Sequence, residues 1–159
     1  MSYNSNTEPY EALWNRALWY LGRRDYGTRE LRLKLLRPRP NKPMPAEEDV
    51  DRAIDRMLEL GLLDDERYAQ RLAESLSRKG FSRHGIAMEL RQKGLDEAPE
   101  IPIADCERLA ELLQTKYNRK LGDERGRLGV YQALLRKGFS HGDIRTAMRD
   151  YIEEDEHGD

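Results

Sequence analysis

The sequence predicts an all-α protein built from helical repeats, and two observations support this prediction. Apolar residues recur at the three- and four-residue spacing of a helix along the chain, and no segment alternates apolar and polar residues over a useful length. In addition, a four-residue pattern that joins a helix end to a helix start occurs three times. We therefore expect no β-strands and a fold that repeats along the chain.

Each copy of this pattern holds a basic, a turn-forming, an aromatic and a small residue, in that order. Successive copies lie 55 and 58 residues apart. Apolar residues follow each copy four and eight positions after its last residue, which places them on one face of the next helix. The three copies are Arg24-Asp25-Tyr26-Gly27, Lys79-Gly80-Phe81-Ser82 and Lys137-Gly138-Phe139-Ser140. The apolar residues that follow them are Leu31 and Leu35, Ile86 and Leu90, and Ile144 and Met148.

The pattern predicts helix ends because glycine adopts, without steric penalty, the left-handed conformation that closes a helix. Ser82 and Ser140 can then cap the next helix through their hydroxyls. In the first copy, Asp25 tolerates the left-handed conformation better than most residues, and Thr28 is the candidate cap. We expect the aromatic residues to pack between helices rather than to stack on bases. The residues predicted to act as structural caps are Gly61, Gly80, Gly94, Gly138, Asp64 and Asp65.

The apolar spacing predicts eight helices in order, with a ninth around residues 96–103 that Pro99 and Pro102 damage. The connection from Pro38 to Pro45 holds four of the seven prolines and is expected to be an extended linker. The successive apolar faces are Tyr10, Leu13, Trp14, Ala17, Leu18 and Leu21; Val50, Ile54, Met57 and Leu58; Tyr68, Leu72 and Leu76; Leu109, Leu112, Leu113 and Tyr117; Leu128, Tyr131, Leu134 and Leu135; and Ile144, Ala147, Met148, Tyr151 and Ile152.

The composition indicates a thin core beneath a densely charged surface, since 38% of the 159 residues are hydrophobic and 36% are charged. No run of 18 apolar residues is present to span a membrane, and the N-terminus shows no signal-peptide pattern. The single cysteine, Cys106, excludes an internal disulfide framework and fits a reducing cytoplasm. The three histidines lack metal-site spacing, and no phosphate loop or nucleophile motif occurs. We expect no enzymatic activity, cofactor or metal.

Charge alternates in bands along the chain, although the net charge is only −2. Each basic band contains one copy of the repeated pattern. If the repeats stack, the basic segments form a regularly spaced cationic strip, which suits a polyanion or a periodic acidic protein surface. The net charges are +7 for residues 15–43, −7 for 46–66, +5 for 67–95, −5 for 96–115, +6 for 116–149 and −6 for 150–159.

The candidate binding residues are the basic side chains of this strip. Two other interpretations stay open: the acidic bands neutralise the basic ones within a small bundle, or residues 24–37 form a helix-turn-helix unit that enters a DNA groove. The candidates are Arg23, Arg24, Arg29, Arg32, Arg37, Arg78, Lys79, Arg83, Arg91, Lys93, Arg136, Lys137 and Arg145.

Several motifs together resemble the RecX family of recombination regulators. The stretch Gly61-Leu62-Leu63-Asp64-Asp65-Glu66-Arg67-Tyr68-Ala69 combined with Lys79-Gly80-Phe81 is specific, whereas either alone is weak. The order and spacing match from Leu13 to Tyr151, nearly the whole chain. The other matching segments are Arg23-Arg24-Asp25-Tyr26, Glu30-Leu31, Glu89-Leu90 and Lys93-Gly94-Leu95.

The resemblance implies three tandem three-helix repeats, and we expect eight to nine helices in an elongated, curved, solenoid-like array. It also implies a cytoplasmic bacterial protein that binds RecA recombinase filaments on single-stranded DNA and inhibits filament growth, ATP hydrolysis, strand exchange and co-protease activity. The cationic strip is then the filament- and DNA-binding surface. We expect a monomer that binds single-stranded DNA alone weakly and without sequence preference. The expected divisions are a disordered tail at 1–9, repeats at 10–63, 64–103 and 104–152, and an acidic tail at 153–159.

The main alternative function is a helix-turn-helix DNA-binding transcription regulator. Sequence-specific readout relies on Arg, Asn or Gln side chains that pair with base edges. The basic segments contain Arg and Lys with few Asn or Gln, which favours contacts with a nucleic-acid backbone or a protein. A peptide-binding helical adaptor would need an apolar groove, and a surface this charged argues against one.

Overall fold

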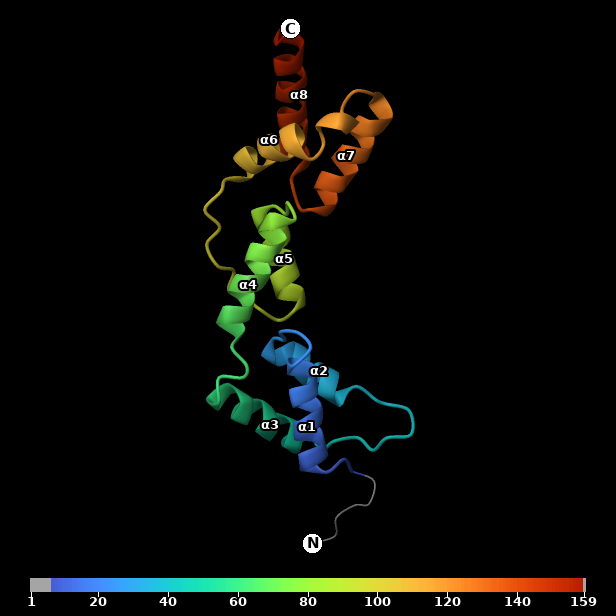
Figure 1. The fold of residues 1–159 in the computed structure, drawn as a ribbon, viewed down its shortest axis with the longest axis vertical. Helices are drawn as coiled ribbons and strands as arrows, with labels where there is room; N and C mark the ends of the chain where they lie inside the picture. Colours follow the sequence, from blue (N-terminus) through green and yellow to red (C-terminus); the bar gives the residue numbers. More distant parts are fainter. Residues whose placement is uncertain (1–6, 159) are drawn as a thin grey trace. The chain divides into compact units, whose positions relative to one another are not determined.

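Helices joined by non-helical connections make up residues 7–158, the part of the chain that the structure describes (Figure 1). In this computed structural model those residues form eight α-helices and one short 3-10 helix, without a β-strand; one isolated bridge pairs Thr7 with Met44. The all-α prediction is confirmed. The helices are α1 (Tyr10–Leu21), α2 (Thr28–Leu36), α3 (Glu47–Glu59), α4 (Asp65–Arg78), α5 (Arg83–Gln92), α6 (Asp105–Thr115), η1 (Asn118–Lys120), α7 (Glu124–Arg136) and α8 (His141–His157).

Two compact units divide the chain, and each has its own hydrophobic core. Unit 1 comprises the chain up to Ala69 together with residues 92–97, and unit 2 comprises residues 70–91 and 98–159. The boundary therefore falls within α4. Since the repeats predicted at 10–63, 64–103 and 104–152 do not coincide with these two units, the repeat boundaries stay a prediction.

The core of unit 1 lies between α1, α2 and α3, and the helical spacing of the apolar residues explains it. Each helix presents residues three, four or seven positions apart to the other two, so each buries one apolar stripe. Tyr26 and Leu63, from the connections, close this core. Its buried residues are Leu13, Ala17, Tyr26, Leu31, Leu35, Val50, Ala53, Ile54, Met57 and Leu63.

Glu8 fixes the segment before α1, although the sequence analysis placed it in a disordered tail. Its buried carboxylate accepts a hydrogen bond of 3.0 Å from Nε of Arg16 and pairs with Arg39 at 2.9 Å. Its backbone N–H donates to the carbonyl of Met44 at 2.9 Å. The prediction is wrong for residues 7–9, because these contacts tie them to α1 and to the proline-rich connection. Residues 1–6 of the predicted tail lie outside the described residues.

Four helices end at a glycine with positive φ, where the glycine-hydrophobe pattern places them. The φ angles are 69° at Gly61, 85° at Gly80, 76° at Gly94 and 91° at Gly138. After three of these glycines the next N–H bonds back over five residues, as at Phe81 to the carbonyl of Leu76 (3.1 Å), which is the Schellman ending. The first copy differs. There α1 already ends at Leu21, and Asp25 does not adopt a positive φ.

The core of unit 2 is formed mainly by α6, α7 and α8, which follow the same rule. Phe139 is buried here, in line with a packing role for the aromatic residue of the repeated pattern. The buried residues are Leu109, Leu113, Tyr117, Leu121, Val130, Leu134, Phe139 and Ile144. Residues 153–157, which the sequence analysis separated as an acidic tail, continue α8 to His157. Residues 95–104, around Pro99 and Pro102, form no helix.

The second and third copies of the repeated pattern pack directly on each other in unit 2. The N–H of Ser82 donates to the carbonyl of Lys137 at 2.9 Å, and Nζ of Lys137 donates to the carbonyl of Lys79 at 2.7 Å. The buried hydroxyl of Ser82 also accepts from the N–H of Gly85 at 2.9 Å, so it caps α5 as the sequence predicts. The two turns are held together by one backbone hydrogen bond and one bond from a lysine side chain to the backbone.

No helix in the described range is long and apolar enough to cross a membrane. Cys106 is an exposed free thiol on α6. Among residues 7–158, no group of three or more His, Cys, Asp or Glu side chains is arranged to hold a metal ion.

Candidate functional site

The structure separates the thirteen candidate cations into those engaged in contacts within a unit and those that remain without a counter-charge. None of the thirteen is buried. They belong to both units, so the single continuous strip that the sequence analysis expects stays a prediction.

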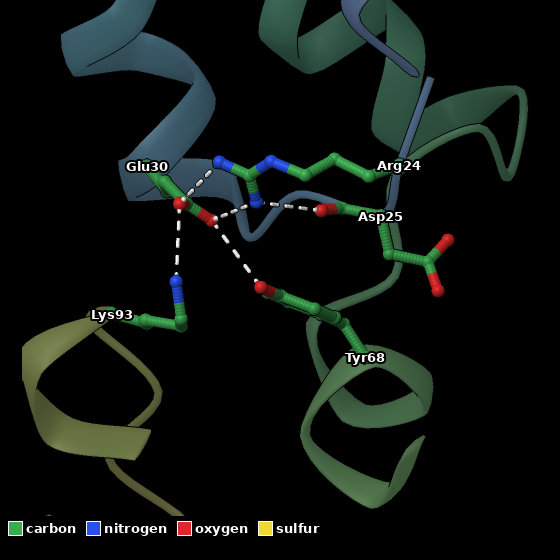
Figure 2. Close-up of polar contacts among 5 residues, drawn as sticks. All are labelled: Arg24, Asp25, Glu30, Tyr68 and Lys93. Atoms are coloured by element: carbon green, nitrogen blue, oxygen red, sulfur yellow. Dashed lines mark hydrogen bonds and ion pairs between the residues drawn. The ribbon is translucent and has the colours of Figure 1, made fainter. Parts of the chain in front are cut away.

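In unit 1, the carboxylate of Glu30 on α2 accepts hydrogen bonds from three side chains, two of which are candidate cations (Figure 2). Its carboxylate accepts from Nη2 of Arg24 at 2.8 Å, from Nζ of Lys93 at 3.3 Å and from the hydroxyl of Tyr68 at 3.4 Å. A second nitrogen of Arg24, Nη1, donates to the carbonyl of Asp25 at 3.1 Å. Arg24 and Lys93 therefore share one carboxylate, and Glu30 connects the first copy of the pattern to the start of α4 through Tyr68 and to the loop after α5 through Lys93.

The ionisation of this group follows from its contacts. Burial raises the pKa of Glu30, but the hydrogen bonds from Arg24 and Lys93 more than offset this, and the pKa lies below its ordinary value. The bond to Glu30 raises the pKa of Arg24. Burial, followed by the charge of Glu30, raises the pKa of Tyr68. Glu30 stays ionised at neutral pH as the acceptor of the group.

Asp65 caps α2 rather than α4, its own helix. Its Oδ1 accepts from the N–H of Thr28 at 2.7 Å and from the hydroxyl of Thr28 at 3.0 Å. Asp64 caps α4 in the expected way by accepting from the N–H of Arg67 at 2.9 Å. The pair is thus divided between two helices, since Asp64 caps α4 and Asp65 caps α2.

Two other candidates of unit 1 also have contacts within that unit. Nε of Arg32 pairs with Asp51 at 2.7 Å on the exposed surface. The stem of Arg29 lies against Gly94, where a Cβ would approach its Cδ to 2.6 Å. Arg29 and Gly94 therefore form a packing contact between α2 and the end of α5.

In unit 2, four cations gather around the packed turns, and we call them the cationic cluster: Lys79, Lys116, Arg136 and Lys137. Nζ of Lys137 lies 4.8 Å from the ring centre of Phe81, in a cation–π contact. Burial and the charges of Lys116, Lys79 and Arg136 lower the pKa of Lys137. No carboxylate in the described part of the chain pairs with any of the four. The cluster is an uncompensated concentration of positive charge.

The remaining candidates lie apart from the cluster's contacts. Arg83 donates to the carbonyl of Ile101 at 2.8 Å, and Arg145 donates to the carbonyl of His141 at 3.3 Å. Arg23 lies 4.2 Å above the ring of Trp19. Arg37, Arg78 and Arg91 are exposed and form no ion pair with residues 7–158.

Comparison with known proteins identifies the relatives of this chain. Residues 64–98 match the family model described as the second three-helix domain of RecX. The regulatory protein RecX of Escherichia coli (strain K12 / DH10B) and that of Shigella boydii serotype 18 are each 32% identical over 166 residues, which covers 96% of this chain and 100% of each relative. The chain belongs to the RecX family.

Solved RecX structures share the fold of the chain. The crystal structure of RecX from Lactobacillus salivarius superposes with a TM-score of 0.60 at 22% identity, over 89% of this chain and 95% of that one. A second crystal structure of a regulatory protein RecX gives a TM-score of 0.63 at 24% identity, over 89% of this chain and 73% of that one. The relatives carry the name of a regulatory protein, and a regulatory role follows for this member of the RecX family.

Sequence reasoning missed three basic residues of this RecX chain. Lys116 belongs to the cationic cluster, and Arg16 and Arg108 lie inside the two units. Arg108 is buried and donates to the carbonyls of Ser77 (2.8 Å) and Phe81 (3.2 Å), which closes the end of α4. Arg16 donates to the carbonyl of Leu35 at 3.1 Å in the same manner at the end of α2. A signal existed for Arg108, because it is the one basic residue in the acidic band at 96–115.

Proposed function

We propose that the protein binds the RecA recombinase filament on single-stranded DNA and inhibits its growth, ATP hydrolysis, strand exchange and co-protease activity. Membership of the RecX family supports a regulatory role of this kind. The observation that carries the proposal is the cationic cluster of unit 2. Four neighbouring cations that lack a carboxylate partner among residues 7–158 are electrostatically complementary to a negatively charged binding surface.

The packed turns suit the cluster to this role. The backbone bond from Ser82 to Lys137 holds the two turns together, and the bond from Nζ of Lys137 to the carbonyl of Lys79 fixes the position of the Lys137 side chain. A prearranged site loses less side-chain entropy on binding than one that orders during association. Burial first, and then the charges of Lys116, Lys79 and Arg136, lower the pKa of Lys137, and an acidic partner or a phosphate relieves the repulsion among these cations.

The test is inhibition of recombinase ATP hydrolysis on single-stranded DNA by the full chain and by the Lys116→Glu/Arg136→Glu variant. Both side chains are exposed, so the double reversal leaves the core intact. We expect it to weaken inhibition by about tenfold or more, while circular dichroism shows unchanged helicity. The matched control is Arg52→Glu/Arg56→Glu on α3, which makes the same change of charge on an exposed surface of unit 1 and leaves inhibition intact.

Two results would contradict the proposal. A wild-type chain that neither co-sediments with recombinase filaments nor slows their ATP hydrolysis has no such function. Tight, salt-insensitive binding to one duplex sequence would instead indicate a transcription regulator, because binding through phosphates alone weakens by a slope of about 0.9 per contact in log affinity against log salt.

A further inference from the structure

Three aromatic rings near the end of α1, in unit 1, contact one another in sequence, and each has a cation beside it. We call these six residues the aromatic ladder: Trp19, Tyr20, Tyr26, Arg23, Lys34 and Arg24. Trp19 is a large apolar side chain left 55% exposed, and it contributes nothing to the core. Its ring centre lies 5.3 Å from that of Tyr20, which lies 6.0 Å from that of Tyr26. The rings grade from exposed at Trp19 to buried at Tyr26, so the ladder is anchored at one end and open at the other.

Each ring of the ladder carries its own cation. The guanidinium of Arg23 lies 4.2 Å from the centre of the Trp19 ring, Nζ of Lys34 5.4 Å from Tyr20, and the guanidinium of Arg24 3.7 Å from Tyr26. Only Arg24, at the buried end, has a carboxylate partner, Glu30. Neither of the other two forms an ion pair with residues 7–158. The open end of the ladder thus combines an exposed indole with two unneutralised cations.

We infer that the ladder is a binding site for single-stranded nucleic acid, in which a base stacks on Trp19 while Arg23 and Lys34 contact the neighbouring phosphates. Proteins that bind single strands without sequence preference combine aromatic rings with a cationic surface in this manner, because every base has a face that stacks. An exposed tryptophan beside an arginine also suits a protein interface. Arg23 and Lys34 form no ion pair with the described residues and lie in a segment of net charge +7. They therefore favour nucleic acid, a polyanion that also has planar bases, over an acidic protein.

This inference rests on the proposed function, because it names the contact that the protein makes with the DNA of the filament. The inference is tested by binding to DNA without recombinase, so that a failure of the inference can be distinguished from a failure of the proposed function. The chain has two tryptophans, and Trp14 packs against the core of unit 1. The Trp14→Phe variant therefore reports fluorescence from Trp19 alone, and Trp19→Phe reports from Trp14 alone.

The probe is a single-stranded oligothymidine of about 15 nucleotides, and its abasic counterpart of equal length and charge is the control. We expect oligothymidine to quench the fluorescence of Trp14→Phe and to leave that of Trp19→Phe unchanged. By fluorescence anisotropy of a labelled strand, Trp19→Ala should bind about fivefold or more weakly, since stacking on one ring contributes at least ~1 kcal/mol. The abasic strand should bind wild type as weakly as oligothymidine binds Trp19→Ala.

Several outcomes would overturn the inference. Equal binding of the abasic strand and oligothymidine would reduce the ladder to a purely electrostatic surface. Quenching by polyglutamate as strong as that by oligothymidine would assign it to an acidic protein. If Trp19→Ala loses the DNA contact and wild type does not inhibit the recombinase, the DNA-binding role of the ladder is supported and the proposed function is wrong. If wild type inhibits the recombinase but DNA does not quench Trp19, the proposed function is supported and the DNA-binding role of the ladder is wrong.

Discussion

Gly85 and Gly138 approach each other so closely that neither position has room for a methyl group. A Cβ on Gly85 would lie 2.2 Å from the carbonyl oxygen of Lys137, and a Cβ on Gly138 would lie 2.5 Å from the Cα of Gly85. The obstructing atoms belong to the backbone, so they cannot move aside as the tip of a side chain can. The two turns that carry Lys79 and Lys137 therefore meet backbone to backbone.

Substituting Gly85 with alanine should loosen this junction. We expect Gly85→Ala to lower the free energy of unfolding by about 2–3 kcal/mol, as overpacking does, despite the gain in helix propensity on α5. Urea denaturation followed by circular dichroism measures the change. Gly129→Ala is the matched control, because Gly129 lies on α7 with no atom near its missing Cβ. That variant should gain about 0.5–1 kcal/mol, and a Gly85→Ala protein as stable as Gly129→Ala would show that the turns do not meet closely.

Removing the charge of Glu30 should weaken its hydrogen bonds with Arg24, Lys93 and Tyr68 and so lower the stability of the fold. Glu30→Gln cannot accept charge-assisted bonds from Arg24 and Lys93, and we expect a loss of about 1–2 kcal/mol in the free energy of unfolding. Asp51→Asn is the control. Asp51 forms an exposed pair with Arg32, and its loss should leave the denaturation midpoint unchanged.

The contribution of Glu30 should also depend on pH in a defined direction. The pKa of Glu30 lies below its ordinary value in the folded protein, so the carboxylate stabilises the fold fully above the unfolded value of about 4.3. As the pH falls below that value and through the lowered pKa, this contribution disappears. The difference in stability between wild type and Glu30→Gln should therefore be constant from pH 7 to about 5 and shrink below about 4. A difference that grows on acidification would contradict the assignment.

Arg108 should be more important for stability than any exposed arginine. Arg108→Met keeps a stem of similar length but removes the donors to the carbonyls of Ser77 and Phe81. The Ser77 carbonyl then keeps only the N–H of Gly80 as a donor, at 3.0 Å. We expect a loss of about 2 kcal/mol in the free energy of unfolding. Arg125→Met on α7 is exposed and should change stability by no more than about 0.5 kcal/mol. Equal stabilities of the two variants would mean that Arg108 does not cap α4.

Local rules in the sequence predict the helix ends and the core faces, whereas the partners of the charged residues depend on the tertiary fold. Arg24 and Lys79 occupy the same place in the repeated pattern, yet Arg24 is paired and Lys79 is not. The residue three positions after the pattern is Glu30 in the first copy and Gly85 in the second. Glycine is required at position 85 because Gly138 approaches it too closely for a side chain. The second copy thus has no carboxylate at this position, and Lys79 forms no ion pair with the described residues. Asp65 shows the same limit, because its capping partner Thr28 lies 37 positions away and no local rule connects the two.

Helix α5 of unit 2 carries a second exposed basic face. Arg83 and Arg91 lie eight positions apart, about two turns along one side, and both are exposed, while Ile86 and Leu90 face the core. If this face also contacts the filament, Arg83→Glu/Arg91→Glu should abolish inhibition of recombinase ATP hydrolysis and keep its helicity. Because Arg83 also donates to the carbonyl of Ile101, Arg91→Glu alone provides the variant without a structural effect and should weaken inhibition in the same direction. Glu47→Lys/Glu48→Lys on α3 should matter little. A double reversal that inhibits as well as wild type would make this face an ordinary solvated surface and leave the cationic cluster as the site of contact.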